Sequence, residues 1–160
     1  MPFFNDIPEI PADPILGLPI AFAADSRPYK VNLGVGAYQT AEGFPLVMTS
    51  VRKAESLLLQ KHLNKEYLPI EGDAEFIRCA LQLLLGSDSP IYQSRQFFAA
   101  QTVGGASALR VAGEFLAKFV SKTIFLSQPS WSNHKLIFER AGLNVGSYPY
   151  FNSETCSLDY

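Results

Sequence analysis

Apolar residues recur at helical spacing in two segments of the first half of the chain. The pattern over residues 51–63 predicts a helix that Thr49-Ser50 cap. A second helix is predicted over residues 73–85, with Gly86 placed to end it in a left-handed cap. The apolar positions are Val51, Ala54, Leu57, Leu58 and Leu63 in the first helix, and Phe76, Ile77, Ala80, Leu81 and Leu84 in the second.

The second half of the chain alternates between strand-like and helical patterns. The predicted elements are a strand over 97–103, a helix over 107–120, a strand over 123–126, a helix ending near Gly142 and a strand over 143–150. Such alternation is typical of an α/β fold with a largely parallel sheet.

Residues 1–47 are the least regular part of the chain. Asp13-Pro14 offers an N-cap followed by a proline at the first helical position. Pro19 comes only five residues later. Because proline disrupts a helix interior, we expect a short turn before Pro19 and the helix proper after it.

The composition is that of a globular protein with a small molecule or another protein as its partner. Only 18% of the 160 residues are charged and the formal net charge is −2. No basic face is available for a nucleic acid, and no apolar stretch approaches the ~20 residues of a membrane span. Cys79 and Cys156 lack metal-site spacing. With no leader-like N-terminus, we expect a cytoplasmic protein without a metal.

The sharpest local feature is Gly104-Gly105-Ala106-Ser107, placed between a predicted strand and a predicted helix. Unpaired N–H groups at a helix N-terminus attract anions, and glycines let a phosphate approach them. Glycines that only permit a tight turn explain the pattern equally well. The spacing of a dinucleotide fingerprint or a P-loop is absent, so a phosphate here would belong to a single cofactor.

Three other side chains are candidates for a site. Trp131 follows a strand end, where a ring either stacks on a flat ligand or closes the rim of the core. His134 at a helix start is either a base or bonded to a neighbour. Tyr67, between helices, either offers its hydroxyl to a ligand or an adjacent subunit, or covers an apolar edge. No carboxylate pair or nucleophile motif stands out.

Six motifs together resemble the class I aspartate aminotransferases, which depend on pyridoxal 5'-phosphate (PLP). They are DPILGL at 13–18, VNLGVGAY at 31–38, VRKAE at 51–55, KEYLPI at 65–70, ALR at 108–110 and PSWSNH at 129–134. The resemblance implies a PLP-dependent transferase-like fold, a three-layer α/β/α arrangement with a mostly parallel sheet that is incomplete in this chain. Residues 1–47 would be an N-terminal arm and part of the small domain, and residues 48–160 the first part of the large PLP-binding domain.

The resemblance also assigns roles to the candidate residues. It implies that Gly104, Gly105 and Ala106 cup the PLP phosphate and that Trp131 stacks on the pyridine ring and touches the substrate. His134 would support the acid that pairs with the ring nitrogen.

The resemblance also implies roles for Gly36 and Tyr67. Gly36 would present its backbone to the substrate carboxylate. Tyr67 would reach the cofactor of the neighbouring subunit in a homodimer. The substrates would be aspartate, glutamate and their 2-oxo acids.

Two departures from the family bear on the cofactor site and on activity. Ala106 stands where threonine or serine usually bonds the phosphate, unless Ser107 replaces that hydroxyl. Family members are also considerably longer, and their Schiff-base lysine lies in the part beyond Tyr160. We therefore expect an N-terminal portion of an aspartate aminotransferase, with no catalytic residue and no activity by itself. The alternative is a non-catalytic remnant that dimerises with a full-length subunit.

Overall fold

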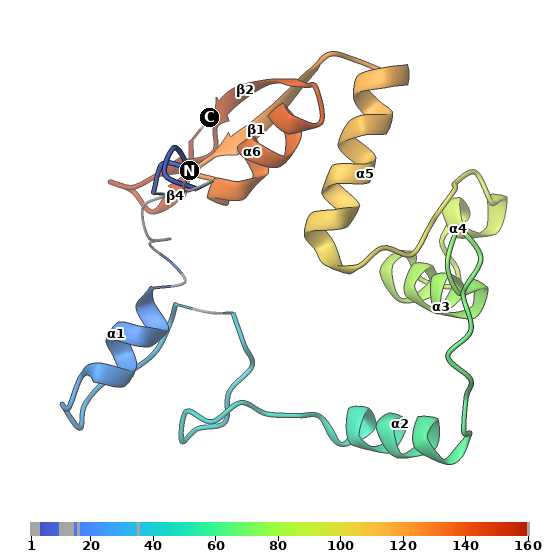
Figure 1. Cartoon of the computed structure of the whole chain (residues 1–160), viewed down its shortest axis with the longest axis horizontal. Helices are drawn as coiled ribbons and strands as arrows, with labels where there is room; N and C mark the ends of the chain where they lie inside the picture. The colour runs from blue at the N-terminus through green and yellow to red at the C-terminus, as the bar shows by residue number, and fades with distance from the viewer. Residues whose placement is uncertain (1–3, 10–14, 16, 35, 160) are drawn as a thin grey trace. The chain divides into compact units, whose positions relative to one another are not determined.

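The computed structural model describes residues 4–9, 15, 17–34 and 36–159, which form six helices and four short strands (Figure 1). The helices are α1 (Leu18–Ala24), α2 (Thr49–Gln60), α3 (Ala74–Leu85), α4 (Pro90–Ser94), α5 (Gly104–Phe119) and α6 (Ser132–Arg140). The strands are β1 (Thr123–Gln128), β2 (Asn144–Pro149), β3 (Phe151–Asn152) and β4 (Ser157–Leu158). The chain divides into two units, residues 1–65 and 66–160.

The first unit contains α1 and α2. Pro19 lies in the first turn of α1, where its missing N–H breaks no helical hydrogen bond, which confirms a helix in this position. The predicted cap at Asp13-Pro14 lies outside the described residues. The prediction of α2 is confirmed, but Thr49-Ser50 are wrong as caps. They form its first turn, and the N-cap is Met48, which supplies no side-chain hydrogen bond.

The second unit begins with α3, whose predicted bounds are confirmed. Its N-cap is Asp73, and the Asp73 carboxylate accepts a hydrogen bond of 2.7 Å from the Phe76 N–H. Gly86 ends the helix with the expected positive φ of 82°, but its ψ of 144° is extended rather than that of a left-handed cap. The sequence patterns did not predict α4, a helix of five residues that begins with a proline.

The predicted strand over residues 97–103 is absent. Its backbone has no strand partner among the described residues, and the Gln101 N–H donates instead to the Glu71 carbonyl over 2.8 Å. A strand needs a neighbour to pair its N–H and C=O groups, and the apolar pattern alone cannot supply one. The apolar residues of this segment still pack locally, since Phe97 stacks on Tyr92 with ring centroids 6.1 Å apart.

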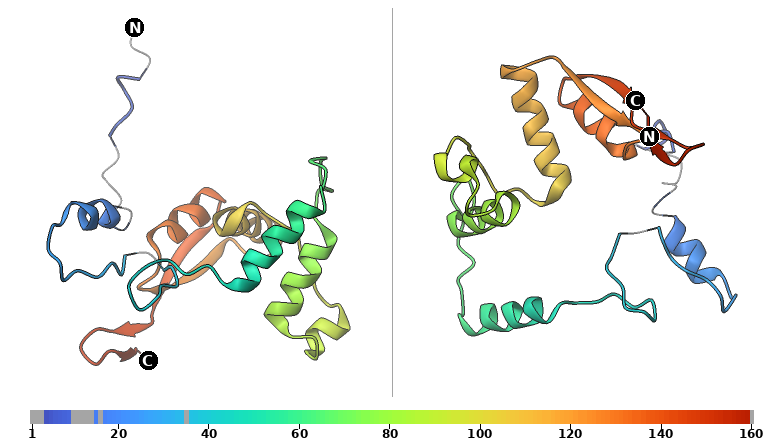
Figure 2. Two further views of the ribbon diagram at one scale, coloured as in Figure 1. Left: turned by 90° about the horizontal axis from the view of Figure 1, so that it is seen from below. Right: turned by 180° about the vertical axis from the view of Figure 1, so that it is seen from behind.

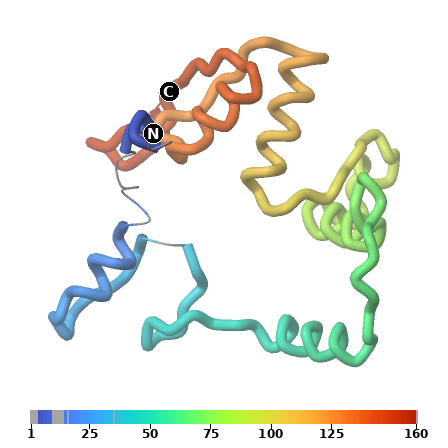
Figure 3. Tube along the Cα trace, in the orientation of Figure 1, coloured from blue at the N-terminus to red at the C-terminus, as the bar shows by residue number. Residues whose placement is uncertain are grey.

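An α/β unit follows. In it β1 and β2 form a parallel pair, and α6 connects the two strands. The two strands pair in parallel from Thr123 opposite Asn144 to Gln128 opposite Pro149. The helix α6 packs against both strands, as the tube in Figure 3 and the views in Figure 2 show. The predicted α/β class and the parallel pairing are confirmed, and β3 and β4 add a small antiparallel pair.

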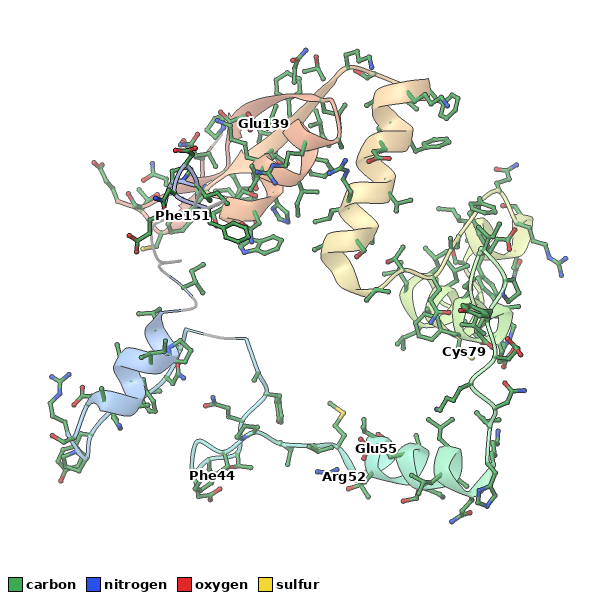
Figure 4. All side chains as sticks on the ribbon, viewed as in Figure 1. Phe44, Arg52, Glu55, Cys79, Glu139 and Phe151 are labelled. Carbon is green, nitrogen blue, oxygen red and sulfur yellow. The ribbon has the colours of Figure 1, made fainter. Side chains whose placement is uncertain are left out.

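The core lies where α5 and α6 meet this sheet. Four residues are buried in the described part of the chain: Gly113, Ala117, Phe138 and Leu143. Partly buried apolar side chains pack around them, namely Leu109, Ile124, Leu126 and Val145. The helix α2 has no buried residue, and Figure 4 shows side chains extending all round it. Among the described residues, no helix is long and apolar enough to cross a membrane.

Candidate functional site

The glycine turn, residues 104–106, opens α5 directly. Gly104 has a φ of 74°, a conformation that side chains disfavour, and its N–H donates to the Thr102 carbonyl over 3.0 Å. The Thr102 hydroxyl donates to the Gly104 carbonyl over 3.1 Å. The helix therefore begins at Gly104, three residues before the predicted start at Ser107.

This helix N-terminus has the features of an anion site. No side chain caps α5, so the N–H groups of its first turn, apart from the Gly104 N–H that bonds Thr102, are left for other acceptors. A Cβ built on Gly104 or Gly105 would meet nothing within 4 Å, so the space beside the turn is open. A helix of 16 residues adds its dipole to these donors. Ala106 contributes an N–H group and no hydroxyl, while Ser107 follows in the same turn.

Trp131 and His134 lie together at the carboxyl end of β1. Trp131 is the N-cap residue of α6 and remains 42% exposed. Its ring meets the His134 ring edge-on, with centroids 5.2 Å apart. His134 Nδ1 and the Ser130 hydroxyl are 2.8 Å apart, which confirms the interpretation of a helix-start histidine bonded to a neighbour. An open hollow of about 480 Å³ runs along Trp131, Lys135, the carboxyl end of β1 and residues 145–147 of β2.

The two remaining candidates are Tyr67 and Gly36. Tyr67 lies between α2 and α3 and its side chain is 97% exposed, so its ring covers no apolar edge in this chain. Gly36 belongs to the first unit, and a Cβ built on it would meet nothing within 4 Å. In the described part of the chain, no hydrogen bond or ring contact joins Tyr67, the glycine turn and Trp131.

Gln101, which no sequence pattern singled out, joins residues 71–73 to the segment just before the glycine turn. Its backbone N–H bonds Glu71, and its side-chain Oε1 accepts a hydrogen bond of 2.8 Å from the Asp73 N–H. The only residue type nearby that could have indicated this contact was Gly72, whose φ of 98° lies in the region that favours glycine. No group of three potential metal ligands occurs among the residues that the structure describes.

Comparisons with known proteins give one consistent family. The family model for aminotransferase class I and II matches residues 28–160. The chain is similar to an aspartate aminotransferase of Escherichia coli K12, with 49% identity over 158 residues that cover 98% of this chain and 40% of that protein. A mitochondrial aspartate aminotransferase of Xenopus tropicalis is 49% identical over 152 residues, 94% of this chain and 36% of that protein.

A solved structure agrees with these matches. It is an aromatic-amino-acid aminotransferase of Burkholderia pseudomallei covalently bound to pyridoxal phosphate, with a TM-score of 0.84 and 41% identity. The match covers 97% of this chain and 39% of that one. The chain thus spans about 40% of the length of the curated relatives it matches.

Proposed function

Because the chain belongs to the class I and II aminotransferase family, we propose that it supplies part of the PLP site of an aspartate aminotransferase. That enzyme would move an amino group between L-aspartate and 2-oxoglutarate. The observation that carries the proposal is the uncapped N-terminus of α5 beside two glycines with open space around them. The 49% identity to the E. coli aspartate aminotransferase supports the choice of substrates.

The residues present fit a phosphorylated, flat cofactor. The turn of Gly104, Gly105 and Ala106 would hold the phosphate at the positive end of α5, with the Gly105 and Ala106 N–H groups as donors. The exposed face of Trp131 would stack on the pyridine ring. When bound, PLP serves as the electron sink for the carbon that carries the amino group.

His134 would act through its neighbours. Its Nδ1 is engaged by Ser130 and its ring by the edge of Trp131, so both the ring plane and one nitrogen are fixed. The other nitrogen is then available to hold the acid that faces the pyridine nitrogen, which is a positioning role. Gly36 would offer its backbone to a substrate carboxylate.

The proposed enzyme is a homodimer, because Tyr67 would act in the neighbouring subunit. A side chain that is 97% exposed is free to reach a neighbouring subunit, where its hydroxyl would donate to the cofactor phosphate.

The proposed layout places the arm and part of the small domain at 1–47 and the first part of the PLP-binding domain at 48–160. A cytoplasmic location is also proposed, although the relative in Xenopus tropicalis is named as mitochondrial.

We propose that this chain by itself is inactive, because no lysine in it is placed as a buried amine. The Ser-x-x-Lys spacing occurs at Ser50–Lys53 and Ser132–Lys135, but both lysines are exposed on helices. Lys30 is engaged, since its ammonium donates to the Phe22 carbonyl over 2.7 Å. The second candidate is a non-catalytic partner that lends the exposed Tyr67 side chain to a full-length subunit.

The test is a completed chimera, in which residues 1–160 are joined to the part of the E. coli enzyme that lies beyond the matched segment. We expect the chimera to bind PLP and to transaminate aspartate with 2-oxoglutarate, and the chain alone to do neither. A chimera that folds but binds no PLP would overturn the proposed cofactor site. Turnover by the chain alone, above a borohydride-treated control, would overturn its proposed inactivity.

A further inference from the structure

Gln101 makes two hydrogen bonds to a single stretch of chain, residues 71–73. The Gln101 N–H donates to the Glu71 carbonyl over 2.8 Å, and the Gln101 Oε1 accepts from the Asp73 N–H over 2.8 Å. Asp73 is also the N-cap of α3, where its carboxylate accepts from Phe76. Backbone and side chain of one residue thus bracket the end of the Tyr67 loop, residues 66–73.

Gly72 lies between these two bonds and leaves room for the Gln101 side chain. A Cβ on Gly72 would lie 2.3 Å from the Gln101 Cβ and 2.7 Å from its Oε1. No side chain fits at such distances, and the φ of 98° at Gly72 is itself one that glycine favours. The close approach therefore depends on glycine at 72 and on a side chain of glutamine length at 101.

The two ends of this contact lead to two parts of the proposed cofactor site. On one side, the Gly72 N–H donates to the Pro69 carbonyl over 2.9 Å, which closes a turn just after Tyr67. On the other side, Thr102 follows Gln101 and bonds Gly104, the first residue of the glycine turn. A short and continuous set of hydrogen bonds therefore connects the Tyr67 loop with the phosphate-binding turn.

We propose that Gln101 is a positioning residue that fixes the Tyr67 loop against the glycine turn of the same subunit. The inference rests on the proposed function for its consequence, since Tyr67 would serve the phosphate in the neighbouring subunit. Gln101 would then connect the glycine turn, which holds the cofactor of its own subunit, to Tyr67, which reaches the cofactor of the neighbouring subunit. The hydrogen bonds themselves require no cofactor.

The first measurement tests the contact without PLP. Amide hydrogen exchange in the apo chimera should be roughly two- to tenfold faster at Asp73 in Gln101→Met, which keeps the length of the side chain and loses the acceptor. Gln101→Glu keeps an acceptor and should restore protection, because a carboxylate is favoured at the N-terminus of α3. Gln93→Met on α4 is the matched control and should leave Asp73 unchanged. Equal exchange at Asp73 in wild type and Gln101→Met would overturn the inference.

The second measurement separates positioning from general stability. Gln101→Met should weaken PLP binding by a few-fold, and the same substitution in a Tyr67→Phe background should add little further loss. Full additivity of the two losses would show that Gln101 does not act through Tyr67 and would overturn the positioning role. A chimera without PLP affinity would fail the proposed function, while the exchange at Asp73 would still report on the contact.

Discussion

Gly113 of α5 faces Phe138 of α6 so closely that a Cβ on the glycine would lie 3.0 Å from the Phe138 Cδ1 and 3.0 Å from the Ala141 Cβ. Phe138 is 6% exposed and is one of the few large side chains buried in the described part of the chain. The missing side chain at 113 thus lets α6 approach α5, and the helix interface positions Trp131 and His134 at the start of α6.

Replacing Gly113 with alanine should destabilise the completed chimera by about 1 kcal/mol. Alanine gains up to ~1 kcal/mol of helix propensity over glycine, but overpacking a core contact costs ~1–3 kcal/mol. Denaturant midpoints measure the net effect. In a Phe138→Leu background the same substitution should be neutral or stabilising. A raised denaturant midpoint in the single variant Gly113→Ala would contradict the close contact between Gly113 and Phe138.

Trp131→Ala should weaken PLP binding and lower activity in the chimera, since the ring that stacks on the cofactor is lost. The control is Lys122→Ala, because the Lys122 side chain is exposed and only its carbonyl is used, accepting from the Asn144 N–H over 2.7 Å. PLP titration and aspartate turnover should separate the two variants. Equal losses in both would contradict the placement of the cofactor.

Ala106→Thr should tighten PLP binding in the chimera by at most ~1–2 kcal/mol, because a phosphate oxygen gains a hydroxyl donor. Ser107 lies in the same first turn of α5 and is the alternative donor. Ser107→Ala therefore serves as the companion variant. Unchanged affinity in Ala106→Thr, together with a loss in Ser107→Ala, would assign the bond to Ser107.

What the sequence predicted correctly is what local interactions determine. The bounds of α3 follow from an apolar face and from the carboxylate of Asp73, which bonds an N–H three residues away. The strand over 97–103 failed because its pattern says nothing about whether a neighbouring strand is present. Gln101 escaped notice because its partners lie about thirty residues earlier, and no spacing rule connects such distant polar groups.

The candidate site was predicted unevenly for the same reason. The glycine turn was found from its residue types, since glycines before a helix have a local meaning. For Trp131 and Tyr67 the residue patterns left two interpretations open, and the resemblance to a family favoured one of them. The role of Gly36 came only from the resemblance. The position of Gly36 relative to the others is a matter of tertiary arrangement, which residue patterns do not encode.

The last prediction is that the isolated 160-residue chain is insoluble or molten. Only two large side chains, Phe138 and Leu143, are buried among the described residues. Burying one such side chain contributes ~1.5–3 kcal/mol, whereas ordering the backbone costs ~1–2 kcal/mol for each residue.

The pairing of β1 with β2 leaves each strand with one open edge in the described part of the chain, which favours association with other chains. Exposed apolar residues such as Phe98, Val103 and Phe125 add to this tendency. We therefore expect no cooperative thermal transition and poorly dispersed amide NMR signals from the chain alone, and both features to appear in the chimera. A sharp transition with dispersed signals from the chain alone would refute the prediction. It would mean that the chain buries more apolar surface than the structure shows.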